Sequence, residues 1–267
     1  AWKVQRLERI TLCNATCFDK KNLNLMSTIY LEKNSKAKLY GIGVGPGDPE
    51  LLTLKAYRLI KDCDVLAYPA PEIGEGLAFE IVNSFMEIKA KIMPLRVPIE
   101  LSPYHAQKSY DNASKLIENE LELGKSVAVI CLGDPFFYGS FMYLFERLSE
   151  KYIIDIIPGI SSPMTCSAVL KIPLVSRNEI LTILPGPMKE EDLAEQLLNT
   201  DVAVIIKVGN YLPKIRRVLR KLRLENVSYY VERATMRNQK IIDIEKIESS
   251  KVPYFSMILV KKKSRGF

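Results

Sequence analysis

Four glycines alternate with other residues in the stretch LYGIGVGPGDPELLT at 39–53, and this spacing predicts a ligand-binding loop. They stand at positions 41, 43, 45 and 47, between an apolar run and the start of an expected helix. Because glycine has no Cβ atom, the backbone there leaves room for a ligand to approach closely. Pro46 and Pro49 fix the turn and begin the helix. The chemistry expected of this stretch is recognition through backbone groups.

A dinucleotide-binding fingerprint is the first alternative, since a strand followed by G-x-G-x-x-G at a helix start binds a pyrophosphate. The third glycine is missing here: counting from Gly41 places Pro46 at that position, and counting from Gly43 places Asp48 there. A carboxylate inside the loop would also repel a phosphate. The stretch therefore favours a ligand without phosphate, and a plain strand-to-helix turn that needs glycine for its geometry remains the simpler alternative.

The composition is that of a globular protein with one large or two ordinary domains. The chain has 267 residues, of which 48% are hydrophobic and 26% charged, as in other globular chains. It contains no uninterrupted run of about 18 apolar residues, so we expect no membrane partner. The start, AWKVQRLERI, begins with Ala and shows no positive residues followed by an apolar core, which argues against a secretory signal.

Five cysteines and a single histidine predict reduced thiols and no zinc site. Three of the cysteines stand in apolar or helical contexts, at Cys63, Cys131 and Cys166. Buried, reduced thiols are typical of the cytoplasm. Cys13 and Cys17 are four residues apart, as zinc ligands can be, but the chain has only one histidine to complete such a site, so a zinc site is not expected. We therefore expect a cytoplasmic protein that holds no metal.

The net charge of +7 indicates a basic surface or an anionic partner. Two clusters contribute much of it, RRVLRKLR at 216–223 and KKKSR at 261–265. The apolar residues of the first cluster recur at helical spacing, which places its charges on the solvent-facing side of an amphipathic helix. The second cluster is a basic tail. Neither alternates with aromatic residues as a nucleic-acid platform does, so we expect no nucleic-acid partner.

From residue 39 onward, strand patterns alternate with helix patterns, which predicts a mostly parallel sheet with helices on both faces. The expected strands cover 39–44, 65–68, 91–95, 126–132 and 153–157, and the expected helices cover 51–61, 76–83, 107–123, 141–149 and a segment that ends at 167. After a connector at 171–179, further strands are expected at 180–184, 202–208 and 227–231, with helices at 191–198 and 213–222. Two last strands, at 240–244 and 254–260, have no helix between them and are expected to form an antiparallel edge.

These patterns divide the chain into an N-terminal α/β domain with the Gly-rich loop and a C-terminal α/β domain with a mixed sheet. The expected boundaries are an extension of unknown structure at 1–37, the first domain at 38–172, the second at 173–262 and the basic tail at 263–267. In the first domain, GVGPGDPE, GDPFFYGS and PGISS all follow expected strands. Ligands of open α/β sheets bind at the carboxyl ends of strands, so these three junctions are expected to form one site.

Five segments together resemble the tetrapyrrole methylase family. They are GVGPGDPELLTLKA at 43–56, GDPFFYGSFMYLFERL at 133–148, PGISS at 158–162, ILTILPGP at 180–187 and VERATMRNQ at 231–239. Within the family they are most similar to the methyltransferases that act on carbon 20 of precorrin-2 or cobalt-factor II in cobalamin biosynthesis. The resemblance implies two α/β domains of the class III methyltransferase type, a cleft between them that binds S-adenosylmethionine, and a homodimer. That cofactor contains no phosphate, as the Gly-rich loop favours.

The resemblance also implies which residues contact the cofactor. They lie in the three junctions of the first domain and at two strand ends of the second: Pro46, Leu132, Gly133, Asp134, Phe137, Ser161, Ser162, Val208 and Ala234. Only three of them, Asp134, Ser161 and Ser162, have polar side chains. The others are expected to act through backbone groups or packing.

The catalytic groups remain open. Methylases of the family that act on uroporphyrinogen III carry a proton-accepting aspartate directly after the tyrosine of the second strand, whereas here Tyr68 is followed by Pro69. Positioning can supply up to about 7–11 kcal/mol of the acceleration of a methyl transfer, but a proton must still leave the acceptor carbon. Candidate groups for that step are Asp134, Glu100, Glu232 and His105, with Tyr138 as a hydrogen-bonding group. His105 lies beside a proline-rich loop, where a place on the rim is the simpler interpretation.

The implied substrate, precorrin-2 or cobalt-factor II, is a macrocycle with several carboxylates. Four basic residues near expected strand ends could pair with those carboxylates, namely Arg96, Lys207, Arg233 and Arg237. Surface charge explains each of them equally well. Asp48 belongs either to the cofactor loop or to an open trough for the substrate.

Two other functions remain as alternatives. One is another methylase of the same fold, which would act on uroporphyrinogen III, another precorrin, ribosomal RNA or diphthine. The other is a non-catalytic ligand-binding protein. The aromatic residues of GDPFFYGSFMY favour a flat macrocycle as ligand, although their helical spacing also fits core packing.

Overall fold

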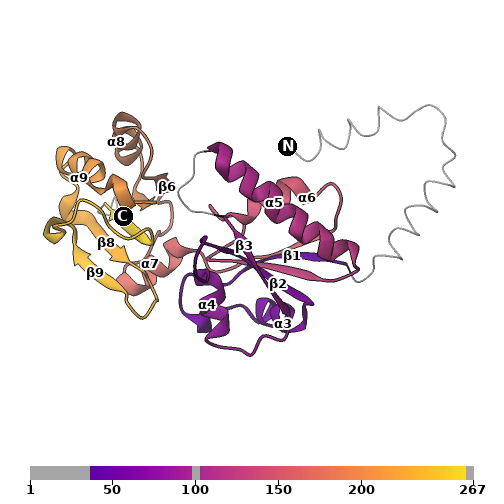
Figure 1. Ribbon diagram of the computed structural model, residues 1–267. Helices are drawn as coiled ribbons and strands as arrows, with labels where there is room; N and C mark the ends of the chain where they lie inside the picture. The colour runs from indigo at the N-terminus through magenta and orange to yellow at the C-terminus, as the bar shows by residue number, and fades with distance from the viewer. Residues whose placement is uncertain (1–36, 98–102, 263–267) are drawn as a thin grey trace.

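The structure, a computed structural model, describes residues 37–97 and 103–262, without the side chains of residues 103–106. These residues form two five-stranded sheets with helices packed on them (Figure 1). Several positions named above lie outside the described residues: positions 1–36 of the expected extension with Cys13 and Cys17, Glu100, the His105 side chain and the tail at 263–267.

The first sheet contains five parallel strands in the order β3-β2-β4-β1-β5, as the alternation of strand and helix patterns predicted. The strands are β1 (Leu39–Gly43), β2 (Val65–Ala70), β3 (Lys91–Arg96), β4 (Val127–Cys131) and β5 (Ile154–Ile157). All five residues of β4 are buried, because a central strand between two helix layers has no solvent-facing side. Since the strands are parallel, their carboxyl ends all lie on one edge of the sheet.

Two pairs of helices cover the faces of the first sheet (Figure 1). They are α3 (Leu54–Asp62) with α4 (Leu77–Asn83), and α5 (Pro103–Glu122) with α6 (Phe141–Leu148). Apolar residues of α3 and α4 pack around Ile42 and Ile130 on one face. Those of α5 and α6 pack around Val65 and Val129 on the other. The two buried layers hold the strand ends, and the loops that follow them, in a fixed arrangement.

The helix expected at 51–61 is divided in the structure, and the division fixes Asp48. The Asp48 carboxylate accepts a hydrogen bond from the backbone N–H of Glu50 at 2.9 Å and caps a 3₁₀ turn at Pro49–Leu51. Thr53 then caps α3 through its hydroxyl. Each cap satisfies a backbone N–H that has no partner inside its helix. Asp48 therefore has a local structural role in the Gly-rich loop.

The second sheet is mixed, with the order β6-β7-β10-β8-β9. Its strands are β6 (Leu181–Pro185), β7 (Val202–Ile206), β8 (Ser228–Glu232), β9 (Lys240–Asp243) and β10 (Ser256–Lys261). The expectation that the last two strands form an antiparallel edge is wrong for β10, which lies between β7 and β8 and is antiparallel to both. Residues 256–260 are all buried, so β10 requires cover on both faces and both sides, which the centre of the sheet provides.

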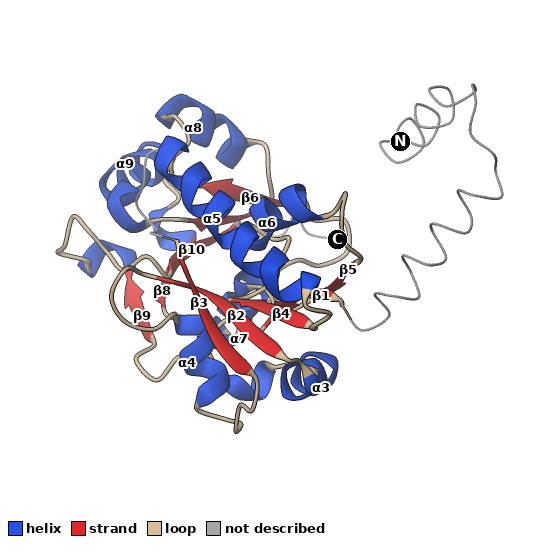
Figure 2. Cartoon of the chain, turned by 45° about the vertical axis from the view of Figure 1, so that its right-hand side comes forward, coloured by secondary structure: helices blue, strands red, loops and turns tan. Residues whose placement is uncertain are grey.

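Three helices complete the second half of the molecule: α7 (Ser162–Leu170), α8 (Glu190–Leu198) and α9 (Leu212–Lys221). α8 and α9 pack on one face of the second sheet, and α7 packs on the other. Figure 1 shows α7 between the two halves, and Figure 2 shows both sheets, in red, with their helices. Among the helices that the structure describes, none is long and apolar enough to cross a membrane.

The three thiols expected to be buried are free and buried, at Cys63, Cys131 and Cys166. Loss of solvation raises the pKa of Cys63 to about 11 and that of Cys166 to about 12. Both groups therefore stay protonated near neutral pH and pack as small apolar side chains.

Candidate functional site

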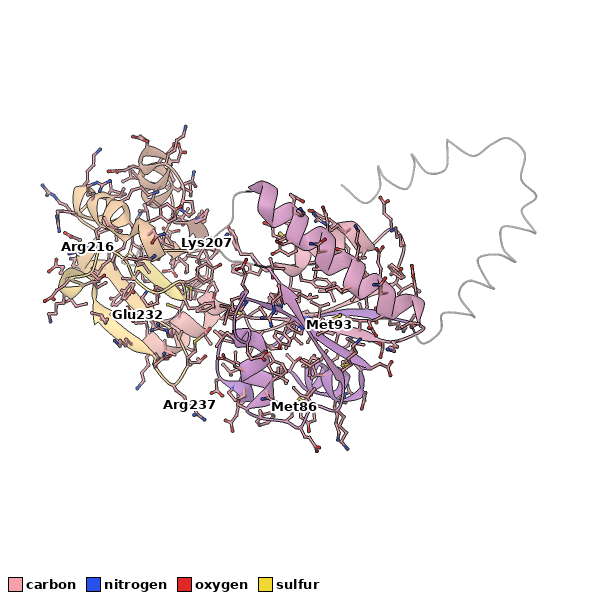
Figure 3. The ribbon with its side chains drawn as sticks, viewed as in Figure 1. Met86, Met93, Lys207, Arg216, Glu232 and Arg237 are labelled. Atoms are coloured by element: carbon pink, nitrogen blue, oxygen red, sulfur yellow. The ribbon has the colours of Figure 1, made fainter. Side chains whose placement is uncertain are left out.

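The carboxyl ends of the first sheet face the second sheet, and two contacts join them. The backbone N–H of Asp48, after β1, donates to the Thr235 hydroxyl, after β8, at 3.2 Å. The Lys207 ammonium, after β7, lies 5.3 Å from the ring centroid of Tyr138, in the loop after β4. Figure 3 shows Lys207 on the side of the second half that faces the first. Because β7 and β8 are both antiparallel to β10, their carboxyl ends share one edge, and the loops of both edges form one site.

Three loops of the first sheet are joined through their backbones. Gly45 and Gly133 exchange two hydrogen bonds, with Gly133 N donating to Gly45 O at 2.7 Å and Gly45 N donating to Gly133 O at 3.3 Å. A Cβ atom on Gly43 would lie 2.4 Å from the Gly133 oxygen, and one on Gly159 would lie 2.1 Å from the same atom. The loops after β1, β4 and β5 therefore approach one another more closely than any side chain would allow.

This packing gives the alternating glycines a structural purpose. A Cβ atom on Gly41 would lie 2.4 Å from the Phe141 ring, and one on Gly47 would lie 2.5 Å from the Met236 side chain. Close packing alone, the simpler alternative raised by the sequence, therefore explains why Gly41, Gly43 and Gly47 are glycines. A ligand of this site would contact the edges of the joined loops, and glycine spacing alone does not identify it.

Asp134 links two of these loops. Its Oδ1 accepts hydrogen bonds from the N–H groups of Phe136 at 2.9 Å and Phe137 at 3.1 Å, and its Oδ2 accepts one from Gly159 at 3.1 Å. Three backbone donors thus occupy both oxygens of this carboxylate. The arrangement suits a residue that positions the loop and disfavours Asp134 as the group that accepts a proton.

The nine residues predicted to contact a cofactor all lie on the two facing edges. Seven follow strands of the first sheet: Pro46, Leu132, Gly133, Asp134, Phe137, Ser161 and Ser162. The other two, Val208 and Ala234, follow β7 and β8 and are buried. Ser161 stands at the N-cap of α7 without a side-chain hydrogen bond to the helix, so its hydroxyl is available to a ligand. Their contact with a cofactor stays a prediction.

The basic candidates fall into two groups. Lys207 and Arg233 both adopt left-handed backbone conformations at strand ends of the second sheet, with φ values of 55° and 49°. Arg237 is exposed in the turn after β8 (Figure 3). In contrast, Arg96 donates from one guanidinium nitrogen to the carbonyl oxygens of residues 71 and 74, each at 2.7 Å. Arg96 thus holds a loop, whereas the other three remain candidates for binding an anion.

Glu232 is turned away from the facing edges. It is buried, and its Oε1 accepts a hydrogen bond from the Tyr230 hydroxyl at 2.8 Å, while Arg233 lies 3.7 Å from Oε2. Tyr230 belongs to the core beneath α8 and α9. Glu232 lines a shallow depression on this side of the second sheet, together with Ile242 and Ile247. Its position fits a structural carboxylate better than a catalytic one.

One pair at the site was missed by the sequence analysis. Tyr68, near the end of β2, donates its hydroxyl to the carboxylate of Glu75 in the next loop. The position directly after Tyr68, where a proton-accepting aspartate was sought, is Pro69. A glutamate seven residues later has no periodic signal, and only the path of the loop brings it back to the strand. The segment PEIGEG, with two carboxylates beside glycines, is the sole hint in the sequence.

Comparison with known proteins agrees with this architecture. The profile of the family Tetrapyrrole (Corrin/Porphyrin) Methylases matches residues 38–248. The chain is 38% identical over 231 residues to the precorrin-2 C(20)-methyltransferase of Sinorhizobium sp, covering 84% of this chain and 94% of that protein. It is 33% identical over 234 residues to the probable cobalt-precorrin-2 C(20)-methyltransferase of Methanocaldococcus jannaschii, covering 85% and 97%.

Solved structures share the fold. The cobalt precorrin-4 methyltransferase CbiF superposes with a TM-score of 0.67 at 20% identity, covering 85% of this chain and 96% of that one. The uroporphyrin-III C-methyltransferase of Thermus thermophilus, complexed with S-adenyl homocysteine, gives 0.61 at 19% identity, covering 84% and 97%. The two facing α/β units are those of a class III methyltransferase. The chain belongs to the tetrapyrrole methylase family.

Proposed function

We propose that the protein is an S-adenosylmethionine-dependent methyltransferase that methylates carbon 20 of precorrin-2, or of its cobalt-containing counterpart, in cobalamin biosynthesis. The observation that carries this proposal is the 38% identity to a precorrin-2 C(20)-methyltransferase over nearly the whole of that protein. A probable cobalt-precorrin-2 enzyme follows at 33%. The strand residue Pro69, in place of the aspartate expected of uroporphyrinogen-III methylases, supports the same branch.

The residues of the facing edges fit the cofactor. Leu132 is partly exposed and offers apolar surface, Pro46, Val208 and Ala234 are buried and shape the loops beneath it, and the Ser161 hydroxyl makes no cap hydrogen bond to its helix. None of the nine predicted contact residues is basic, which suits a ligand without phosphate. When bound there, S-adenosylmethionine supplies an electrophilic methyl group on its sulfonium. Asp134 would keep two of the loops in register around it through its three backbone hydrogen bonds.

The second edge is proposed to hold the macrocycle. Lys207, Arg233 and Arg237 are proposed to pair with substrate carboxylates. Lys207 lies against Tyr138 of the first sheet, Arg237 is exposed in the turn after β8, and Arg233 also pairs with Glu232. The Tyr138 ring, which is 47% exposed beneath the Lys207 ammonium, would offer a flat apolar surface beside that charge. Asp48 has its carboxylate on the Gly-rich loop, where its cap on Glu50 supports a structural role.

Assembly and location are part of the proposal. The family resemblance supports a homodimer in the cytoplasm, and light scattering of the purified protein would measure the dimer directly. The proposed division into two domains rests on the separate cores of the two sheets. Because α7 packs on the second sheet, these cores favour a boundary before α7 instead of one near residue 172. Partners other than the tetrapyrrole and the cofactor are not part of this proposal.

The test is an incubation of the purified protein with S-adenosylmethionine carrying a ¹³C methyl group. Precorrin-2, its cobalt-containing counterpart and uroporphyrinogen III serve as separate acceptors. We expect the label on carbon 20 of one or both precorrin-2 species, located by NMR, and no label on uroporphyrinogen III. Intact binding of S-adenosylhomocysteine without transfer to either precorrin-2 species would contradict the proposal and favour a binding protein. Transfer to uroporphyrinogen III instead would assign the chain to the sister activity.

A further inference from the structure

The five strand ends of the first sheet divide into two groups. Those of β1, β4 and β5 carry the loops joined by glycine. Those of β2 and β3 carry a cluster of polar side chains, formed by Tyr68, Glu75 and Arg96. β2 is paired with β4 through Ala67 and Val129, so the loops after these two strands leave neighbouring strands on the same edge of the sheet. The polar cluster therefore borders the proposed cofactor loops on the same edge.

Tyr68 holds the Glu75 carboxylate at this edge. The Tyr68 side chain is fully buried, and its ring stacks on Phe79 with centroids 4.4 Å apart. Burial, followed by the hydrogen bond to Glu75, raises the pKa of Tyr68 well above its ordinary value. The hydroxyl therefore keeps its proton and acts as a donor to Glu75. Since both the ring and the donated proton are fixed, the carboxylate has a defined position.

The loop that carries Glu75 is fixed at two further points. Arg96 donates to the carbonyl oxygens of Pro71 and Gly74 at 2.7 Å, immediately before Glu75. Gly76, immediately after it, packs so tightly that a Cβ atom there would lie 2.1 Å from the Pro69 oxygen. A short loop restrained on both sides of one residue presents that residue with little freedom.

Glu75 differs from the other carboxylates of the site in its available capacity. Asp134 accepts three backbone hydrogen bonds, and Glu232 is enclosed by Tyr230 and Arg233. Within residues 37–97 and 103–262, Glu75 accepts a single hydrogen bond, from Tyr68, and forms no ion pair. A carboxylate can accept about four hydrogen bonds. Glu75 is therefore positioned and still able to accept a proton from a ligand.

We propose that Glu75 is the catalytic residue that accepts the proton released from the methylated carbon, a role that rests on the proposed function. In the reaction, carbon 20 forms a bond to the methyl carbon while the bond between that carbon and sulfur breaks. The sulfur keeps the electron pair, and the macrocycle gains one positive charge. Carbon 20 then carries both hydrogen and methyl. Transfer of that proton to Glu75 restores the conjugation, and Glu75 passes the proton to solvent.

The test compares Glu75→Gln with Glu72→Gln in the full protein. Gln can still accept the Tyr68 hydrogen bond but cannot accept a proton, and Glu72 is an exposed carboxylate of the same loop. The measurements are kcat, KM for the tetrapyrrole, Kd for S-adenosylhomocysteine, and the kinetic isotope effect with deuterium at carbon 20.

For Glu75→Gln we expect kcat to fall by about 10²–10⁴-fold, the usual effect of removing a general base. KM and Kd should stay within about twofold, and a primary isotope effect should appear because proton removal becomes rate-limiting. Glu72→Gln should match the wild type, and Glu75→Asp should recover part of the loss.

Two results would overturn the role of Glu75. One is an active Glu75→Gln variant. The other is a loss of kcat without an isotope effect and with a matching loss of cofactor binding or melting temperature, which would identify Glu75 as a support of its loop. A wild type that methylates neither precorrin-2 species would instead overturn the proposed function, and this inference with it. An active wild type with an equally active Glu75→Gln variant overturns the inference alone.

Discussion

The two edges that face each other are built by different means. The first sheet makes its tight loops mostly with glycine, at Gly45 and Gly133 in left-handed conformations and at Gly43 and Gly159 in close backbone contact, with Tyr138 as a left-handed exception in the loop after β4. The second sheet makes its turns with larger residues in left-handed conformations, namely Lys207, Arg233 and Thr235. Such a conformation costs a non-glycine residue roughly 1–2 kcal/mol. The second edge thus retains side chains at a cost that glycine would have avoided.

This difference indicates a division of tasks. In the first sheet, glycine allows three loops to pack backbone against backbone, whereas in the second sheet Lys207 and Arg233 keep charged side chains despite the strain. Substitutions in the first edge should therefore alter shape and cofactor binding together. Substitutions of the basic side chains on the second edge should alter tetrapyrrole binding alone. Four variants test this comparison, in decreasing order of expected effect.

The largest effect is expected for Gly159→Ala. The new Cβ atom would lie 2.1 Å from the Gly133 oxygen, a backbone atom that cannot move away easily. We expect a loss of about 3 kcal/mol in the free energy of unfolding, at the upper end for overpacking, and loss of S-adenosylhomocysteine binding. Urea denaturation measures the free energy of unfolding, and titration calorimetry measures the binding of S-adenosylhomocysteine.

The matched control is Gly209→Ala in the second half. A Cβ atom there would meet only the Val252 oxygen, at 3.9 Å, so stability should change by less than about 0.5 kcal/mol. If Gly159→Ala were as stable as this control and bound the cofactor normally, the first edge would not depend on glycine packing.

Asp134→Asn should have the next largest effect. The amide keeps one acceptor oxygen and replaces the other by a donor, so the hydrogen bond from Gly159 or those from Phe136 and Phe137 must be lost. Hydrogen bonds to charged groups contribute about 1.5–3 kcal/mol, and we expect a destabilisation of about 2 kcal/mol with weaker cofactor binding. A fall in kcat with unchanged stability and cofactor affinity would argue instead for a chemical role of Asp134.

Lys207→Met is expected to act on the tetrapyrrole only. It removes the charge and keeps the side-chain stem, so KM for the tetrapyrrole should rise about tenfold, equivalent to about 1.4 kcal/mol, while Kd for S-adenosylhomocysteine stays constant. Lys221→Met, at the solvent-exposed end of α9, is the control. If both variants raised the KM for the tetrapyrrole equally, only the net charge of the protein would matter. If Lys207→Met changed the Kd for S-adenosylhomocysteine, the two edges would not have separate roles.

Glu120→Gln should have the smallest effect and none on activity, because Glu120 lies at the amino-terminal edge of the first sheet. Its carboxylate pairs with Lys91 at 2.5 Å and Lys125 at 2.7 Å. These hydrogen bonds, that of Lys125 foremost, lower the pKa of Glu120. The resulting stabilisation, about 1 kcal/mol, is complete above the ordinary pKa of glutamate and is lost as the pH falls through the lowered value.

The measurement for Glu120 is urea denaturation of wild type and variant from pH 7 down to pH 3. The difference in unfolding free energy should be constant near neutral pH and disappear in acid. A difference that showed no decrease at all toward low pH would mean that packing, and not charge, stabilises this contact. Methyl transfer at pH 7 should be the same in both proteins.

Much of the fold was predictable because its strands are apolar runs between glycine and proline. β2, β4 and β7 lie within a residue or two of their expected positions. The central place of β10 was not predictable. Alternation along one chain indicates strands but does not indicate which strands pair, and the apolar stretch at 256–260 suits an edge or a centre until its burial is known.

The site was predictable in outline only. Strand ends of an open sheet mark the loops, so the predicted cofactor residues gather on the facing edges as expected. The uses of individual side chains depend on contacts between distant segments. Asp134 reaches Gly159, and Arg96 turns back to residues 71 and 74, neither of which is visible in local spacing. Glu75 was overlooked because loop geometry, and no periodic pattern, returns it to Tyr68.

The central position of β10 also affects the order in which the protein can assemble during synthesis. All strands of the first sheet are complete once residue 157 has been made, so that sheet can form early. The second sheet cannot, because β6 and β7 on one side and β8 and β9 on the other are joined only through β10. Domains fold from the N-terminus as the chain emerges. The glycine-built edge is therefore expected to exist as a folded surface before its charged counterpart is completed against it.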